Sequence, residues 1–243
     1  MSVSDKPRSE GENRRYYDTF ADAYERHRHD GYHRWLDERT VSLLEPMVRG
    51  KTTLEVGCGT GLLLKDVAPL AHQAIGVDLS HGMLRAAAAR GLSVVQGSAT
   101  QLPFRDSSFD VVYSFKVLAH VPDLATAFQE MARVTKPGGQ LVLELYNAHS
   151  LRYLVRKLRP AGVVGQNTDE KDVFTRFYTL AELEALIPTG VRLDRIEGLR
   201  IATLAPQVFR WPGVGPLWTR LEDGLSRSPL RRFGGFLVLV LQK

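Results

Sequence analysis

The sequence predicts a doubly wound α/β domain, in which helices cover both faces of a mostly parallel, seven-stranded sheet. Three observations lead to this prediction. Short apolar runs of strand length alternate with amphipathic helical segments along most of the chain, the pattern of repeated β-α-β units. A glycine-rich turn separates the first of these strands from the segment after it. The 243 residues are enough to bury one substantial core.

The composition is that of an ordinary globular protein, with 44% hydrophobic and 24% charged residues. No apolar run approaches the roughly 20 residues of a membrane-spanning helix, and the polar N-terminus does not resemble a signal peptide. The single cysteine, Cys58, excludes an intrachain disulfide and is compatible with a reducing compartment. We therefore expect a cytoplasmic protein. A net charge of +5 permits an acidic partner without favouring nucleic acid.

The N-terminal part is expected to be a tail followed by two helices. Residues 1–13 are polar and contain proline and glycine, which favours a mobile tail. Of the two helices that follow, the second is expected over 32–47, and Pro46 and Gly50 mark its end. Its inner face comprises Leu36, Thr40, Leu43, Leu44 and Met47. The first helix begins near Arg14, and its apolar face comprises Tyr17, Phe20, Ala21 and Tyr24.

The strands follow from apolar runs bounded by turn residues. They are expected over 52–56, 73–77, 92–96, 109–115, 140–145, 191–196 and 236–241. Ser80 is a candidate N-cap, Asp123 starts a later helix, and Thr179 with Glu182 forms a capping box. A helix is also expected over 62–70, and residues 136–139 form a turn into the fifth strand.

Two segments near the C-terminus extend this core. Residues 147–160 form a basic amphipathic helix, with leucines on one face and arginines on the others. Packing on the domain is its simplest role, and contact with an anionic substrate or a membrane surface is the alternative. Residues 160–175 are expected to be a loop. A partly helical insertion before the last strand contains Trp211, Trp218, Leu221 and Leu225.

The glycine-rich turn, LEVGCGTG at 54–61, predicts a ligand site, because glycine lacks the Cβ that would block close approach of a ligand. Its spacing is not that of the dinucleotide motif G-x-G-x-x-G, whose third glycine would stand at Leu62. No Gly-Lys-Ser/Thr follows, which excludes a Walker loop. Glu55 disfavours a pyrophosphate and suits an ammonium or sulfonium group.

These residues resemble motif I of the class I S-adenosylmethionine-dependent methyltransferases, in particular the small-molecule group that includes the ubiquinone/menaquinone-type enzymes. The resemblance continues through residues 52–147, in the blocks GVDLS, GSATQLPF, FDVVYSFKVLAHVPD and KPGGQLVLELYN. It implies a single methyltransferase domain over 14–243. The domain divides into an N-terminal helical lid (14–50), a cofactor-binding core (51–147), a substrate-side lid and insertion (148–235) and a last strand (236–243).

The resemblance implies that S-adenosylmethionine is the cofactor. Asp78, about 20 residues past the glycine loop, would accept hydrogen bonds from the ribose hydroxyls, although alone it could be a helix cap. Ser98 stands where many relatives have aspartate, so adenine recognition would rest more on backbone amides near Ala99 and on apolar stacking. Tyr17 and Tyr24 either cover the cofactor or pack on the domain. The cofactor-contact candidates are Tyr17, Tyr24, Glu55, Gly57, Cys58, Gly59, Gly61, Asp78, Leu79, Met83, Ser98, Ala99 and Phe115.

Methyl transfer is an in-line displacement that needs alignment, a dry pocket and, for a protonated acceptor, a base. His120 is the best candidate base, because it follows the fourth strand at the carboxyl edge of the sheet. Its alternative role is to cap the following helix. Lys116, Tyr146 and His149 are weaker candidates, and Lys116 could instead hold an anionic acceptor. The sequence shows no metal-ligand spacing, so no metal is expected.

The acceptor is expected to be a small molecule, aromatic or anionic, methylated on oxygen or carbon rather than nitrogen. The motif Asn/Asp-Pro-Pro-Tyr/Phe, typical of enzymes that methylate nucleobase amines, is absent at 115–118. There are two alternatives. One is an RNA or protein methyltransferase, which the basic residues at 152–159 and 227–232 favour. The other is a module that binds the cofactor without catalysis. No oligomeric state is predicted. Aromatic residues that could contact an acceptor or belong to the core are Phe174, Phe177, Tyr178, Phe209, Trp211 and Trp218.

Overall fold

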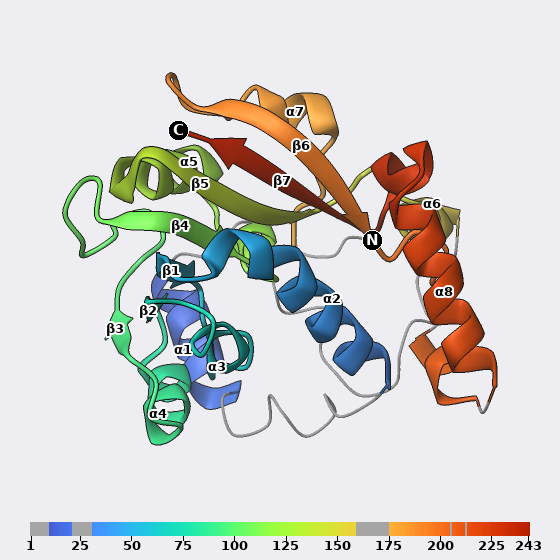
Figure 1. Ribbon diagram of the computed structural model, residues 1–243, viewed down its shortest axis with the longest axis horizontal. Coiled ribbons are helices and arrows are strands. Elements are labelled where there is room, and N and C mark those ends of the chain that lie inside the picture. Colours follow the sequence, from blue (N-terminus) through green and yellow to red (C-terminus); the bar gives the residue numbers. More distant parts are fainter. Residues whose placement is uncertain (1–9, 21–30, 159–174, 205, 212) are drawn as a thin grey trace.

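A seven-stranded sheet with the strand order β3-β2-β1-β4-β5-β7-β6 runs through the molecule (Figure 1). The structure is a computed structural model that describes residues 10–20, 31–158, 175–204, 206–211 and 213–243. β7 is antiparallel to both of its neighbours, and the remaining pairs are parallel. The predicted α/β fold class is confirmed. The strands are β1 (Thr52–Val56), β2 (Gln73–Asp78), β3 (Val94–Gln96), β4 (Phe109–Ser114), β5 (Thr135–Tyr146), β6 (Arg192–Leu199) and β7 (Phe236–Gln242).

Helices lie on both faces of this sheet. The α-helices are α1 (Glu10–Phe20), α2 (Gly31–Val48), α3 (Leu64–Val67), α4 (His81–Ala89), α5 (Leu124–Val134), α6 (Leu151–Leu158), α7 (Leu180–Glu184) and α8 (Val214–Ser226). Short 3-10 turns are η1 (Leu118–His120), η3 (Pro206–Arg210) and η4 (Pro229–Phe233). The predicted caps are confirmed, since Ser80 caps α4, Asp123 caps α5, and Thr179 forms a capping box with Glu182.

The two faces of the sheet are separated by the alternation of side chains along each strand. In β7, the leucines at 237, 239 and 241 pack toward α5 and α7, where they meet Phe128 and Leu183. The valines at 238 and 240 pack on the opposite face with residues of α2, including Trp35 and Leu44. Both faces of the central strands are therefore buried, as expected for a doubly wound sheet.

Several boundaries differ from the sequence prediction. α1 begins at Glu10, so the expectation of a tail through residue 13 is wrong for the last four residues. Pro46 lies inside α2 rather than at its end, because Met47 and Val48 are buried and continue the packed face. α3 covers only 64–67, because the residues on either side of it form turns. Tyr24, Ala21 and Phe174 lie outside the described residues.

β5 differs most from its prediction. Thr135 joins α5 directly to β5, and its partner is Phe109 of β4. The next paired position of β4 is Val111, whose partner is Gln140, so residues 136–139 bulge from the strand. Gly138 has a φ of 78° in this bulge. The turn expected at 136–139 is thus an irregularity inside the strand.

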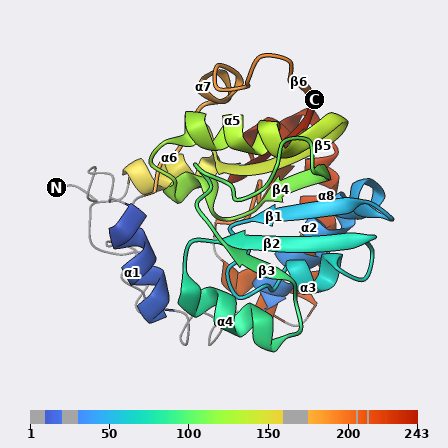
Figure 2. The same ribbon diagram turned by 90° about the vertical axis from the view of Figure 1, so that its left-hand side faces the viewer.

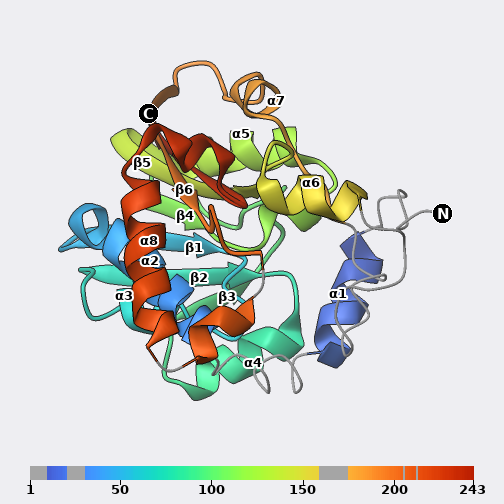
Figure 3. The ribbon, with the colours of Figure 1, turned by 90° about the vertical axis from the view of Figure 1, so that its right-hand side faces the viewer.

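α1 lies across the edge of the sheet where the parallel strands end (Figure 2). Asn13 Nδ2 donates to the backbone oxygen of His120, which follows β4 (3.3 Å). Asp18 Oδ1 accepts from Ser80 Oγ (2.6 Å) and from the backbone N–H of Gly82 (2.9 Å), which follow β2. Because β1 lies between β2 and β4 in the sheet, a helix that contacts residues after both of these strands lies across the carboxyl end of β1. α6 lies on this side of the molecule as well (Figures 2 and 3).

Candidate active site

The glycine loop follows β1, and its three glycines have different roles. Gly57, Gly59 and Gly61 have φ values of 77°, 54° and 80°, a left-handed conformation that disfavours other residues. A Cβ at Gly57 would collide with Val117, and one at Gly61 would collide with Leu92. At Gly59 a Cβ would meet nothing within 4 Å. The open face of the backbone is therefore at Gly59, whereas Gly57 and Gly61 are required by packing within the protein.

Asp78 joins the end of β2 to this loop. Its Oδ2 accepts from the backbone N–H of Gly59 (2.8 Å), and its Oδ1 accepts from the N–H of Ser80 (2.9 Å). Burial raises the pKa of Asp78, and these hydrogen bonds oppose the shift. Each carboxylate oxygen has a second lone pair, so the group can also accept from a ligand's hydroxyls. The helix-cap alternative does not hold, because Ser80 is the N-cap of α4.

Glu55 lies in β1 beneath the loop and is fully buried. Tyr113 Oη donates to its Oε2 at 3.4 Å. Burial raises the pKa of Glu55 well above its ordinary value, and the charge of Asp78 adds to the shift. Tyr113 and Lys116 act in the opposite direction. The raised pKa favours the neutral form of Glu55, so the negative charge beside the loop comes from the hydrogen-bonded carboxylate of Asp78, which suits a cationic ligand.

Other predicted contacts are brought near the loop, but not all through their side chains. The thiol of Cys58 packs with Leu64 and Leu84, and burial raises its pKa. Its backbone N–H donates to the backbone oxygen of Val77 in β2 (3.0 Å). Met83 and Phe115 are buried, and Leu79 is half-buried. The loop therefore presents backbone, with apolar side chains supporting it from below.

Ser98 and Ala99 follow β3 on the other side of Asp78. The backbone N–H of Thr100 donates to Ser98 Oγ (3.1 Å), and the two hydroxyl oxygens are 2.8 Å apart. The Ser98 hydroxyl thus stabilises a local turn. Ala99 is half-buried against the main core. This arrangement is compatible with adenine recognition through backbone and apolar contacts, which stays a prediction.

Asp18 is a site residue that sequence reasoning missed. Its contacts with Ser80 and Gly82 hold α1 against the first turn of α4, and these hydrogen bonds lower its pKa. A Cβ at Gly82 would lie 2.9 Å from the backbone oxygen of Asp18. A glycine at the start of an alanine-rich helix was the signal available in the sequence. Tyr17 is half-buried in the same helix, and its ring meets that of Tyr16 edge-on.

His120 ends η1 at the carboxyl edge, close to α1. Thr175 Oγ1 lies 3.4 Å from its Nδ1, and its ring meets Tyr146 edge-on at 6.1 Å. The predicted alternative, in which His120 caps the next helix, is wrong, because Asp123 accepts from the N–H of Thr126 and caps α5.

An aromatic row continues from His120 along the ends of the strands. Tyr146 lies 5.4 Å from Phe177 and 5.1 Å from Phe236, measured between ring centroids. Tyr153 of α6 lies 4.8 Å from Phe177. α6 therefore contacts the domain through Tyr153, whereas Leu151 and Leu154 of this helix are exposed.

The other predicted aromatic residues lie elsewhere. Tyr178 is buried in the main core, and Phe209 stacks on Trp35 of α2 at 5.1 Å. Trp218 donates to Thr203 Oγ1 (2.8 Å), and Trp211 is exposed. Among these residues, Phe177 belongs to the aromatic row.

Two basic residues after β4 and β6 have left-handed backbone conformations. Lys116 has a φ of 62°, and its Nζ pairs with Asp37 of α2 at 2.7 Å. This pairing makes Lys116 a poor base. Arg200 has a φ of 60° and is buried with its guanidinium 5.0 Å from the ring centroid of Tyr32. Strained residues of this kind are often found at functional sites. His149 is exposed.

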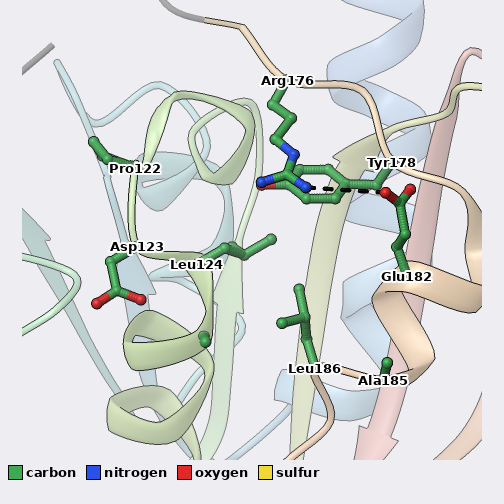
Figure 4. Close-up of a pocket in the computed structure, with 9 residues that line it drawn as sticks. Pro122, Asp123, Leu124, Arg176, Tyr178, Glu182, Ala185 and Leu186 are labelled. Carbon is green, nitrogen blue, oxygen red and sulfur yellow. Dashed lines mark ion pairs between the residues drawn. The ribbon is translucent and has the colours of Figure 1, made fainter. Parts of the chain in front are cut away.

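A separate open pocket of about 350 Å³ lies between α5 and α7 (Figure 4). Arg176 lies over the ring of Tyr178 there and forms a 3.9 Å ion pair with Glu182. None of the predicted cofactor contacts lines this pocket.

In the described parts of the chain, no cluster of three histidine, cysteine or acidic side chains could hold a metal ion. No helix in those parts is both long and apolar enough to cross a membrane.

Comparisons with known proteins match this arrangement. A family model described as a methyltransferase domain matches residues 54–143. A demethylmenaquinone methyltransferase of Mycolicibacterium paratuberculosis is 38% identical over 185 residues, which cover 72% of this chain and 73% of the relative. The enzyme of that name from Bacillus licheniformis is 39% identical over 117 residues, 45% of this chain and 50% of the relative.

Structural similarity extends over almost the whole chain. A crystal structure from Thermotoga maritima, described as a SAM-dependent methyltransferase and possible histamine N-methyltransferase, has a TM-score of 0.68. It is 23% identical and covers 94% of this chain and 99% of its own, so the likeness concerns the fold. The open backbone at Gly59 and the Asp78 carboxylate beside it fit an adenosyl sulfonium ligand. The chain belongs to the class I S-adenosylmethionine-dependent methyltransferases, similar to the quinone methyltransferases, and S-adenosylmethionine is its cofactor.

Proposed function

We propose that this enzyme methylates a carbon or oxygen atom of an aromatic small molecule that binds against the aromatic row. The observation that carries the proposal is the imidazole of His120, which meets the ring of Tyr146 where β4 and β5 end, at the same sheet edge at which the glycine loop follows β1. Flat aromatic acceptors pack well against such rings. The quinone in the name of the Mycolicibacterium paratuberculosis relative belongs to this class.

The proposal assigns a role to each part of the site. Asp78 accepts hydrogen bonds from the ribose, and the backbone at Gly59 approaches the cofactor. α1, held by Asn13 and Asp18, acts as a lid that excludes water. S-adenosylmethionine supplies an electrophilic methyl group on a sulfonium. His120 takes the proton that the acceptor loses as its new bond to the methyl carbon forms.

An anionic form of the acceptor is favoured by Arg200 rather than by Lys116. Asp37 already pairs with Lys116. Arg200 is buried, and among the described residues no carboxylate forms an ion pair with it. Burial lowers the pKa of Arg200, and the nearby charge of Arg152 lowers it further. The phenolate or enolate that develops as His120 takes the acceptor's proton would offset this positive charge.

The alternative of an RNA or protein substrate rests on exposed basic residues. Several of them, including Arg231 and Arg232, lie beside exposed apolar residues such as Leu230 and Phe233. This mixture is less suited to RNA than a continuous basic surface would be. Loss of RNA retention at low salt would remove that alternative.

A direct test is turnover with a reduced naphthoquinone as acceptor, monitored by formation of S-adenosylhomocysteine and of the methylated product. His120→Ala is expected to lower kcat by about 100-fold, the lower range for loss of a general base. The affinity for S-adenosylmethionine should stay within about twofold, because the ring contacts described above go to Thr175 and Tyr146, on the acceptor side. His149→Ala, on an exposed histidine, is the matched control.

Each outcome bears on a different part of the proposal. Unchanged turnover of His120→Ala would remove the base role while leaving the acceptor class intact. Absence of turnover by the unmodified enzyme with reduced naphthoquinones, alongside methylation of RNA or protein, would overturn the acceptor class. Location of the new methyl group by mass spectrometry would decide between carbon and oxygen.

A further inference from the structure

Exposed apolar side chains are concentrated in the C-terminal part of the chain. Of the ten large hydrophobic side chains that are exposed in the described residues, all except Val95 lie within 151–233. Leu217 is 67% exposed and Trp211 is 58% exposed. Single exposed apolar residues are normal on protein surfaces, but such a concentration indicates a contact surface.

The exposed residues of α8 form one stripe. Val214, Leu217 and Leu221 are spaced by three and four positions, so they lie on one side of the helix. The buried residues Glu222 and Ser226 lie on the other side. α8 stands on the outside of the molecule (Figures 1 and 3). Its inner face is packed, so the apolar stripe faces outward in a well-anchored helix.

Glu222 provides that anchor. Its Oε2 accepts from the backbone N–H of Ile201 (2.8 Å). Its Oε1 accepts from the N–H groups of Ala202 (3.0 Å) and Thr203 (2.7 Å). The orientation of the stripe is therefore fixed by four backbone and hydroxyl donors, the fourth being Thr203 Oγ1 at 2.5 Å.

The charges that border the stripe are positive. Arg220 of α8 and Arg227, the C-cap residue of this helix, are exposed and seven positions apart, about two turns along one edge. The two acidic residues of α8 are both engaged, Glu222 as above and Asp223 with Arg39 at 3.8 Å. η4 follows directly and adds two exposed arginines, at 231 and 232, between the exposed Leu230 and Phe233.

We propose that the α8–η4 surface (Trp211, Val214, Leu217, Leu221, Leu230, Phe233 and the arginines at 220, 227, 231 and 232) docks on an anionic lipid membrane. An outward apolar stripe bordered by arginines is the pattern of a helix that lies in the plane of a membrane interface. Tryptophan is enriched at that depth, and arginines gain from anionic headgroups. The charge complementarity favours this occupant over a second copy of the chain, whose arginines would repel those of the first.

The test uses the full chain and vesicles of phosphatidylcholine, with or without phosphatidylglycerol. Sedimentation of bound protein and a blue shift of tryptophan fluorescence report binding. We expect binding to the phosphatidylglycerol vesicles that weakens at high salt. Leu217→Glu should weaken it at least tenfold, because an apolar side chain in the membrane is replaced by a charge that the anionic surface repels. Val95→Glu, at an exposed apolar position outside the surface, is the matched control.

A second variant tests the electrostatic part. The double substitution Arg231→Gln, Arg232→Gln should weaken binding to phosphatidylglycerol vesicles by about fivefold for each arginine. All positions are exposed, so unchanged thermal unfolding is expected and verifies folding of each variant.

Three results would overturn the proposal. One is failure of the unmodified protein to bind phosphatidylglycerol vesicles. Another is equal binding by Leu217→Glu. The third is a dimer in sedimentation analysis that Leu217→Glu dissociates without any vesicle binding, which would assign the surface to a second copy. No acceptor is used, so the outcome is independent of the proposed function. Leu217→Glu should methylate a water-soluble acceptor at the unmodified rate.

Discussion

The contact between Gly82 and α1 permits a sharp test of the lid. In Gly82→Ala, the added methyl group would lie 2.9 Å from the backbone oxygen of Asp18 and 3.1 Å from its Cα. Both atoms belong to the backbone of α1, so the helix must move rather than a side chain. The movement lengthens the hydrogen bonds that Asp18 Oδ1 accepts from Ser80 Oγ and from the N–H of residue 82.

The magnitude follows from these two bonds and from helix propensity. A hydrogen bond to a charged group contributes about 1.5–3 kcal/mol, but Asp18 is partly exposed, so we discount the pair to about 1–2 kcal/mol for the docked state. Alanine in place of glycine stabilises α4 by about 0.8–1 kcal/mol. The weakened hydrogen bonds reduce the stability of the docked position of α1, whereas the higher helix propensity stabilises α4. In the free energy of global unfolding the loss and the gain largely offset each other. α1 should loosen while the free energy of global unfolding stays nearly unchanged.

Two measurements separate these effects. Hydrogen exchange should become faster in the peptide that contains α1, and calorimetry should give a cofactor Kd raised by about 5–30-fold. Gly224→Ala in α8 is the matched control, because its Cβ would meet nothing within 4 Å. Unchanged exchange in α1 would refute the steric argument. Faster exchange with an unchanged Kd would instead show that α1 does not cover the cofactor.

Three further predictions concern the loop and the core. Gly57→Val should abolish measurable cofactor binding in calorimetry, through strain at positive φ and collision with Val117, and retained binding would contradict this account. Glu55→Gln should be more stable than the native protein by a margin that grows with pH. Because the folded pKa of Glu55 is raised, native stability is lost as pH rises from the ordinary value of 4.5 toward the folded pKa, by about 1.4 kcal/mol for each pH unit in that interval. Urea unfolding at acidic and at mildly basic pH measures the difference, and an equal margin at both would argue against it. Glu222→Ala should cost about 3 kcal/mol in urea unfolding, because three backbone donors, two of them in buried hydrogen bonds, lose their acceptor, and a cost below about 1 kcal/mol would contradict the anchoring role.

The parts of the fold that were predictable from sequence depend on short-range patterns. The caps Ser80, Asp123 and Thr179 are predictable because a capping side chain and the backbone N–H that it binds are only three positions apart in the sequence. The strands were found within a few residues of their ends, apart from the early start of β5, because buried strands are apolar runs.

The contacts that escaped prediction join residues far apart in the chain. Asp18 meets Ser80 across the sheet edge, and Lys116 pairs with Asp37 of α2. Their side chains look like ordinary surface charges in the sequence. The same limit applies to His120, whose position beside Tyr146 depends on the pairing of β4 with β5. The cofactor side is encoded in one continuous stretch, whereas the acceptor side is assembled from residues spread over the second half of the chain.

The burial of Cys58 has a practical consequence. It is the chain's one cysteine, it packs among leucines under the glycine loop, and its raised pKa keeps it protonated near neutrality. Thiol-reactive fluorophores and spin labels are therefore expected to react only slowly with the native protein. Cysteines introduced in pairs on the outer surfaces of α1 and α5 could carry such labels, and the distance between them would report opening of the lid during turnover.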